Sequence, residues 1–360
     1  MNVTAVDHVE LYVGDAPATA QYLCEAFGFR CYGQGGPETG LPGQRSLLLG
    51  QGQIRLLVTS ALAEDHPVAQ YVERHGDGVA CVALSTDDAA GAFTHAVRAG
   101  ALPIVQPRTW QHGDATVVTA TVSGPGAVTH RLVERRGGGA DFLPGAIDLL
   151  TPDPEQGDEF LAEIDHLALC VGGGDLDPTV RFYQEVFGFS EIFEERVEVG
   201  DQAMDSKVVQ SGSQRITLTI VSPDPKNRTG QLEDFLRAND GPGVQHLAMS
   251  THDIATAVRV YRERGVRFLT TPESYYDGIA QRLGTVSLPV EALRAGNILV
   301  DRDHWGEMFQ IFTESPFARR TFFLELIERH GALTFGTNNI RALYEAKERA
   351  RIAAETSTLA

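Results

Sequence analysis

The fold is decided by the stretch Asp165-His166-Leu167-Ala168-Leu169-Cys170-Val171-Gly172, which repeats the earlier stretch Asp7-His8-Val9-Glu10-Leu11-Tyr12-Val13-Gly14. Three further matches follow in the same order: residues 25–29 with 185–189, residues 76–100 with 241–265, and residues 133–137 with 327–331. The longest of them keeps a constant offset of 165 residues without a gap. Self-similarity of this kind is typical of a repeated structural unit, so the chain is a duplicated domain.

Each copy predicts two units of the βαβββ type. Apolar Val9, Leu11 and Val13 alternate with His8, Glu10 and Tyr12, which is the period-two pattern of a strand, and residues 167–171 alternate in the same way. Helices are predicted over 17–27 and 178–187, because each begins with a proline and ends at a glycine suited to a C-cap.

Second helices should start at N-caps Ser85 or Thr86 in the first copy and Thr251 in the second, and run to Gly100 and Gly265. The sequence therefore predicts an α+β protein with four βαβββ units.

The duplication also predicts the domain limits. We expect a first domain over residues 1–137, a linker over 138–160 that is rich in Gly, Pro and acidic residues, and a second domain over 161–360. Residues 338–355 are amphipathic and predict a helix that closes the second domain.

The composition excludes several classes of partner. The formal net charge is −18, with no basic stripe, which disfavours nucleic acid and anionic membranes. No apolar run approaches the ~20 residues of a membrane span, and the N-terminus lacks the pattern of a signal peptide. The four cysteines form no CxxC pair, so we expect a cytoplasmic protein with free thiols.

The two copies differ where a metal site is expected. His166, His246 and Glu325 lie on predicted strands of the second copy, about one βαβββ unit apart, and their counterparts in the first copy are His8, Cys81 and Arg131. Two histidines and one carboxylate form the facial triad that binds Fe(II) and leaves positions open for O2 and an organic ligand. A complete set exists only in the second half.

Spacing alone leaves a structural role for these residues open. A single histidine on a strand is commonly structural, whereas Glu325 inside an apolar run requires a partner, because an unpaired buried carboxylate is costly. No GxGxxG, P-loop, GxSxG or HExxH motif occurs, so phosphate-binding and serine-hydrolase chemistry have no support.

Four motifs carry a resemblance to a known family. They are Gly243-Val244-Gln245-His246-Leu247-Ala248, Thr271-Pro272-Glu273-Ser274-Tyr275-Tyr276-Asp277, Phe309-Gln310-Ile311-Phe312-Thr313, and Phe335-Gly336-Thr337-Asn338-Asn339-Ile340-Arg341-Ala342-Leu343-Tyr344. Together with the duplicated units, they resemble the 4-hydroxyphenylpyruvate dioxygenase family of the vicinal oxygen chelate superfamily, which includes 4-hydroxymandelate synthase.

The resemblance implies two domains, each with a curled, open-barrel sheet and outer helices, and a metal only in the second. It implies Fe(II) on His166, His246 and Glu325, an aromatic α-keto acid as substrate, O2 as co-substrate, and a homo-oligomer. Substrate-pocket residues implied by the motifs are Ser206, Thr219, Val221, Gln231, Gln310, Phe312, Phe335, Asn339 and Ile340.

Three of these positions bear on the product. Ring-hydroxylating members, which form homogentisate, typically carry Pro, Asn and Phe at the positions that Thr219, Val221 and Ile340 occupy here. The residues of this chain resemble the synthase pattern instead. The resemblance therefore implies benzylic hydroxylation to 4-hydroxymandelate, a precursor for peptide antibiotics. The alternatives are the homogentisate-forming enzyme of tyrosine catabolism and a non-catalytic, ligand-sequestering protein of the same superfamily, against which the intact triad argues.

Overall fold

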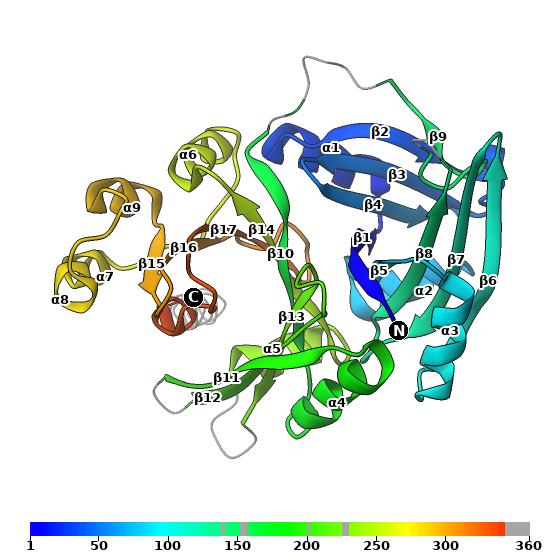
Figure 1. The fold of residues 1–360 in the computed structure, drawn as a ribbon. Coiled ribbons are helices and arrows are strands. Elements are labelled where there is room, and N and C mark those ends of the chain that lie inside the picture. The colour runs from blue at the N-terminus through cyan, green and yellow to red at the C-terminus, as the bar shows by residue number, and fades with distance from the viewer. Residues whose placement is uncertain (138–140, 152–156, 158, 200–201, 225–229, 343–360) are drawn as a thin grey trace, which may run out of the picture.

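Two curled mixed sheets, each a half-barrel with helices on its outer side, form the protein in the computed structural model (Figure 1). The structure describes all residues except 138–140, 152–156, 158, 200–201, 225–229 and 343–360. The predicted α+β class and the duplicated βαβββ units are confirmed.

The first half contains strands β1 (Val3–Tyr12), β2 (Arg30–Gly35), β3 (Gln44–Gln51), β4 (Ile54–Ala61), β5 (Gly78–Thr86), β6 (Pro103–His112), β7 (Ala115–Ser123), β8 (Thr129–Arg136) and β9 (Asp148–Leu149). Its helices are α1 (Ala16–Phe27), the short 3-10 helix η1 (Pro37–Thr39), α2 (Pro67–His75) and α3 (Ala89–Arg98).

The second half contains strands β10 (Leu161–Cys170), β11 (Ser190–Val199), β12 (Gln202–Gln210), β13 (Thr217–Pro223), β14 (Gly243–Thr251), β15 (Leu299–Arg302), β16 (Glu307–Phe312) and β17 (Phe323–His330). Its helices are α4 (Leu176–Phe187), α5 (Gln231–Ala238), α6 (Ile254–Glu263), α7 (Glu273–Asp277), α8 (Ile279–Leu283) and α9 (Val290–Gly296). Helices α7 to α9 are an insertion before β15 that the repeat analysis did not predict.

Apart from the added strand β9, the two sheets have the same strand order. The first sheet runs β6-β7-β8-β5-β1-β4-β3-β2-β9. The second runs β11-β12-β13-β10-β14-β17-β16-β15, which is the order of the equivalent strands read from the other edge. In each sheet the first strand of one unit pairs antiparallel with the first strand of the next, as β1 with β5 and β10 with β14. These central pairs bring residues from both units of a half onto one concave face.

The first helix of each half ends at its predicted glycine, whereas the second helices begin later than predicted and end at Arg98 and Glu263, two residues before Gly100 and Gly265. Gly28 and Gly188 adopt the left-handed conformation after α1 and α4, with φ of 72° and 71°. The N-caps of α3 and α6 are Asp88 and Asp253, whose side chains accept hydrogen bonds from backbone amides three residues on. The prediction of Ser85, Thr86 or Thr251 as caps was wrong, because those residues are still part of β5 and β14.

The halves share one apolar core. Residues of both sheets belong to the same buried cluster, in which Phe27 of α1 contacts the ring of Tyr261 on α6. His130 on β8 lies 3.1 Å from the Tyr183 hydroxyl on α4, and burial lowers the pKa of His130 to about 4. The buried part of this contact at His130 and Tyr183 is therefore made by uncharged groups.

Part of the predicted linker is attached to the first half. Strand β9 pairs with β2, and Phe142, Leu143 and Ile147 are buried against the first sheet. The division at residues 137 and 161 stays a prediction. Residues 337–342 are helical, and the rest of the predicted closing helix lies outside the described residues.

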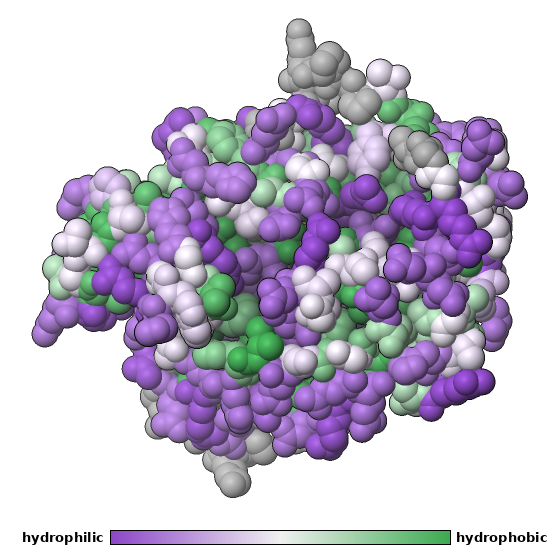
Figure 2. All heavy atoms as spheres, viewed as in Figure 1, coloured by the Kyte–Doolittle hydropathy of each residue, from purple (hydrophilic) through white to green (hydrophobic). Residues whose placement is uncertain are grey.

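Hydrophilic side chains cover most of the face seen in Figure 2, and apolar residues lie between them in smaller groups. Among the described residues, no helix is both long and apolar enough to cross a membrane.

A partly buried ion pair joins β1 and β8 in the first half. The Arg131 guanidinium on β8 donates to Glu10 Oε2 on β1 at 2.7 Å, and its other nitrogen lies 3.2 Å from His8 Nε2. Thr59 donates to the second Glu10 oxygen at 2.9 Å. Because Glu10 is 3% exposed, removal of Arg131 would leave an uncompensated buried carboxylate.

We predict that Arg131→Met destabilises the first half by about 3 kcal/mol or more. Trp110 and Trp305 are the two tryptophans, so urea unfolding in a Trp305→Phe background reports on the first half through Trp110 fluorescence. Arg74→Met removes an exposed ion pair with Asp240 and should cost ~1 kcal/mol or less. Equal losses in the two variants would contradict the assignment.

Candidate metal centre

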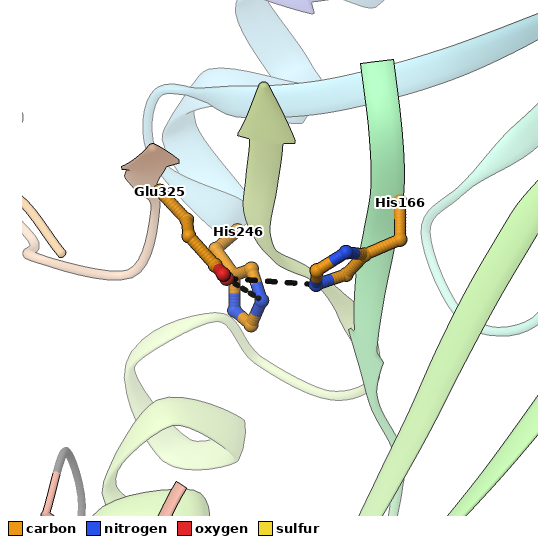
Figure 3. A group of neighbouring side chains, drawn as sticks. All are labelled: His166, His246 and Glu325. Carbon is orange, nitrogen blue, oxygen red and sulfur yellow. Dashed lines mark ion pairs between the residues drawn. The ribbon is translucent and has the colours of Figure 1, made fainter. Parts of the chain in front are cut away.

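Three strands of the second sheet bring His166, His246 and Glu325 together. His166 lies on β10, His246 on β14 and Glu325 on β17, and their side chains converge on one point of the concave face (Figure 3). All three are buried, and their candidate ligand atoms lie within 4.8 Å of one another. The spacing pattern in the sequence therefore corresponds to a cluster in space.

The geometry fits a metal ion. Glu325 Oε2 lies 3.5 Å from His166 Nε2 and 3.3 Å from His246 Nε2 (Figure 3). Adjacent ligands at ~2.1 Å from one ion stand ~3 Å apart, so small movements would bring all three into coordination. Two imidazoles and one carboxylate are the donor set of non-haem Fe(II) sites, and these residues could hold that ion.

A partly buried salt bridge orients His166. Its Nδ1 donates to Asp165 Oδ1 at 2.8 Å, and Arg329 on β17 donates to both Asp165 oxygens at 2.7 and 2.9 Å. This keeps a proton on Nδ1 and directs Nε2 toward Glu325. Burial alone would raise the pKa of Asp165, but the hydrogen bonds from Arg329 and His166 outweigh it and hold that pKa below its usual range.

The histidine and the carboxylate stabilise each other's charge. Burial alone would lower the pKa of His166, but the charge of Glu325 and the hydrogen bond to Asp165 raise it above its ordinary value. Burial alone would raise the pKa of Glu325, but the charge of His166 lowers it. Without a metal ion, the proton on His166 is therefore the cation that compensates the buried carboxylate.

The same supporting residues occur in the first half. Asp7 accepts from His8 Nδ1 at 2.7 Å and from Nε and Nη2 of Arg135 at 2.8 and 2.7 Å. Strand register places Arg131 where Glu325 stands, because Arg131 pairs with Ala83 on β5 as Glu325 pairs with Ala248 on β14. A guanidinium beside His8 Nε2 repels a metal cation, so a side-chain cation takes the place of the ion there.

A cavity lies in front of the triad, and the empty space in it and in the open solvent at its mouth amounts to about 640 Å³. Its predicted lining residues are Ser206, Thr219, Val221, Gln231, Gln310, Phe312, Phe335 and Ile340. Asn339 is not among the lining residues; it is fully buried behind them, with its side-chain amide donating to Gln310 Oε1 at 2.8 Å.

Four lining residues were missed by sequence reasoning: Phe193, Met204, Leu232 and Gln245. Met204 could have been found, because it shares a strand face with Ser206 two residues away. Gln245 could not, because it faces the cavity next to His246 only through a bulge. Ala168 pairs with His246 and Leu169 with Val244, which leaves Gln245 as the extra residue.

Comparisons with known proteins agree with this site. Residues 5–126 and 163–311 match the model of the glyoxalase/bleomycin resistance protein/dioxygenase superfamily. The chain is 34% identical to a 4-hydroxyphenylpyruvate dioxygenase of Yarrowia lipolytica, over 95% of this chain and 91% of the relative. It is 33% identical to one of Neurospora crassa, over 97% and 92%.

A solved structure also resembles this one over its whole length. A triple mutant of 4-hydroxymandelate synthase from Streptomyces coelicolor superposes with a TM-score of 0.88 and 41% identity, over 98% of this chain and 100% of that one. A fusion protein of a xylose isomerase-like barrel and a 4-hydroxyphenylpyruvate dioxygenase, at 24% identity and a TM-score of 0.75, shares the fold over 96% of this chain.

We predict that the affinity for a divalent ion continues to rise with pH above 6.5, the ordinary histidine pKa. The raised pKa keeps His166 protonated at neutral pH, so the ion must displace a proton, and affinity should rise by up to about tenfold per pH unit until His166 is deprotonated. Competition with a chelator between pH 6 and 9 measures this. A plateau already at pH 6.5 would contradict it.

Proposed function

Because the chain belongs to the 4-hydroxyphenylpyruvate dioxygenase family of the glyoxalase superfamily, we propose that it is an Fe(II)-dependent dioxygenase that forms 4-hydroxymandelate. The reaction takes 4-hydroxyphenylpyruvate and O2 to 4-hydroxymandelate and CO2. The observation that carries this proposal is the His166–His246–Glu325 triad at the end of a cavity whose walls include Thr219, Val221 and Ile340.

In this proposal the triad holds the iron ion, and the cavity orients the substrate toward it. When bound, Fe(II) would be chelated by the α-keto acid and would activate O2 for decarboxylation and hydroxylation. The chain's own groups hold the substrate: Phe312 and Phe335 are apolar walls, and Ser206, Gln231 and Gln310 offer hydrogen bonds. The Oε1 atom of Gln231 is buried without a protein partner among the described residues, so it suits a donor on the substrate.

One side of the cavity is apolar at the positions where ring-hydroxylating members typically carry a polar and an aromatic residue. Val221 on β13 is buried in a cluster with Met204, Leu232 and Phe235, and Ile340 packs against the same cluster. Valine offers no hydrogen bond where asparagine would offer a donor and an acceptor. Isoleucine is smaller than phenylalanine. Both features support a tilted aromatic ring that presents the benzylic carbon to the iron site.

The second candidate is the homogentisate-forming dioxygenase, because curated relatives such as those of Yarrowia and Neurospora carry the name 4-hydroxyphenylpyruvate dioxygenase. A ligand-sequestering protein of the superfamily is disfavoured, since it needs no cluster of two imidazoles and a buried carboxylate at the end of its cavity.

We expect the purified protein with Fe(II), ascorbate, O2 and 4-hydroxyphenylpyruvate to yield 4-hydroxymandelate, measured by chromatography with O2 uptake. Glu325→Gln should lose at least ~100-fold in rate, because a neutral amide is a poor ligand in place of a carboxylate. Glu314→Gln, at a half-exposed carboxylate outside the cavity, is the matched control and should keep full rate. Homogentisate would overturn the mandelate branch, and no O2 uptake would overturn the dioxygenase.

We further predict that Val221→Asn combined with Ile340→Phe diverts part of the product to homogentisate and slows turnover. The two changes restore a polar contact and an aromatic wall on the side of the cavity formed by β13 and residue 340. Ile192→Phe introduces the same aromatic ring at an exposed position of β11 and should leave the product unchanged. A double variant that keeps both rate and product would show that these positions do not steer the ring.

A further inference from the structure

A chain of buried hydrogen bonds runs from the triad to the C-terminal segment. Gln310 Nε2 on β16 donates to Glu325 Oε1 at 2.8 Å, and Asn339 Nδ2 donates to Gln310 Oε1 at 2.8 Å. The Tyr275 hydroxyl of α7 lies 2.9 Å from Asn339 Oδ1. Gln310 is 2% and Asn339 0% exposed, so water does not substitute for these bonds.

The hydrogen bonds in this series have a fixed donor-to-acceptor direction. A carboxylate only accepts hydrogen bonds, so Glu325 requires the NH2 group of Gln310 and turns the amide oxygen of Gln310 away. That oxygen in turn requires a donor, which Asn339 supplies. The orientation of Glu325 and the position of residue 339 are therefore mutually dependent, although Asn339 does not touch the cavity.

The backbone before Asn339 is also shaped to Gln310. Gly336 has a φ of +72°, and a Cβ atom there would lie 2.9 Å from Gln310 Oε1. The helical residues 337–342 start here, with the Ile340 amide donating to the Gly336 carbonyl at 2.9 Å. The segment thus passes in direct contact with the residue that holds Glu325.

A second route joins the same segment to another ligand. Phe335 meets the His166 ring edge-on, with centroids 5.2 Å apart. Arg329, which holds Asp165, donates to the Thr334 carbonyl at 2.7 Å and lies 5.4 Å above the Phe335 ring. Residues 334–340 therefore contact the supports of two of the three ligands.

We propose that residues 334–342 and the metal ligands form one coupled unit, in which Asn339 is a positioning residue that acts on Glu325 through Gln310. Metal binding orders Glu325 and strengthens docking of the segment; docking, by thermodynamic reciprocity, raises metal affinity. The inference rests on the proposed function only in requiring that a metal ion binds the triad.

The neighbouring residue offers a matched control. Asn338 donates to Asp301 on β15 through its backbone amide at 2.9 Å and its side-chain amide at 3.0 Å, and neither hydrogen bond involves Gln310. Asn338→Ala weakens docking of the segment but leaves the hydrogen bonds from residue 339 through Gln310 to Glu325 in place. Asn339→Ala removes the first of these hydrogen bonds.

The test uses the full chain with Co(II) as the probe ion, chelator competition for affinity, and hydrogen exchange of peptides covering 334–342. In the wild type, Co(II) should slow exchange of this segment. Asn339→Ala should lower Co(II) affinity ~10–100-fold and remove the slowing. Asn338→Ala should raise exchange in both states but keep affinity within about threefold. If Asn339→Ala does not fold, the isosteric Asn339→Asp, which replaces the donor with an acceptor, should show the same losses.

The outcomes separate the two proposals. Wild-type affinity in folded Asn339 variants, or equal losses at 338 and 339, would overturn the coupling alone. Co(II) binding that Glu325→Gln leaves intact would overturn the metal centre itself. A merely structural role of Asn339 would lower the thermal midpoint equally with and without Co(II), whereas a positioning role reduces the increase that Co(II) produces.

Discussion

A carboxylate buried in the middle of an apolar strand requires a cation, and the groups around the metal centre are arranged to meet that requirement. Glu325 is 1% exposed on β17, with His166 and His246 on the neighbouring strands β10 and β14. The protein can satisfy it with a proton on His166 or with a metal ion. The supporting groups Asp165, Arg329 and Gln310 then set where that cation sits and how Glu325 faces it.

The first half meets the same constraint by a different solution. It keeps the Asp–His–Arg support but places Arg131 where Glu325 stands and Glu10 where Ala168 stands, so that its cation is covalently part of the chain. Apart from β9, the two sheets share a strand order, and they differ at a few side chains. These differences give the first half a structural ion pair and the second half a site that can hold a metal ion. In the second half, a cavity lies in front of the exchangeable cation, which links the metal site to the space for a ligand.

The sequence predicted much of the fold and of the candidate metal centre. Repeats with period-two and helical patterns predicted the βαβββ units and the glycine-terminated helices, because local backbone preferences decide these features. The correspondence of His8, Cys81 and Arg131 with the triad also agrees with the strand register. The N-caps were placed too early because Ser85, Thr86 and Thr251 are good capping residues that strand pairing keeps in β5 and β14.

The sequence by itself determined the duplication, the class of fold, and the three residues whose chemistry suits a metal ion, since each is a property of residue type and spacing. Only the tertiary structure decided that Asn339 acts behind the cavity and that Gln245 faces into it beside His246. A bulge in β14 and a left-handed glycine at 336 produce these placements. Both depend on contacts between strands and segments distant in sequence, which no local pattern records.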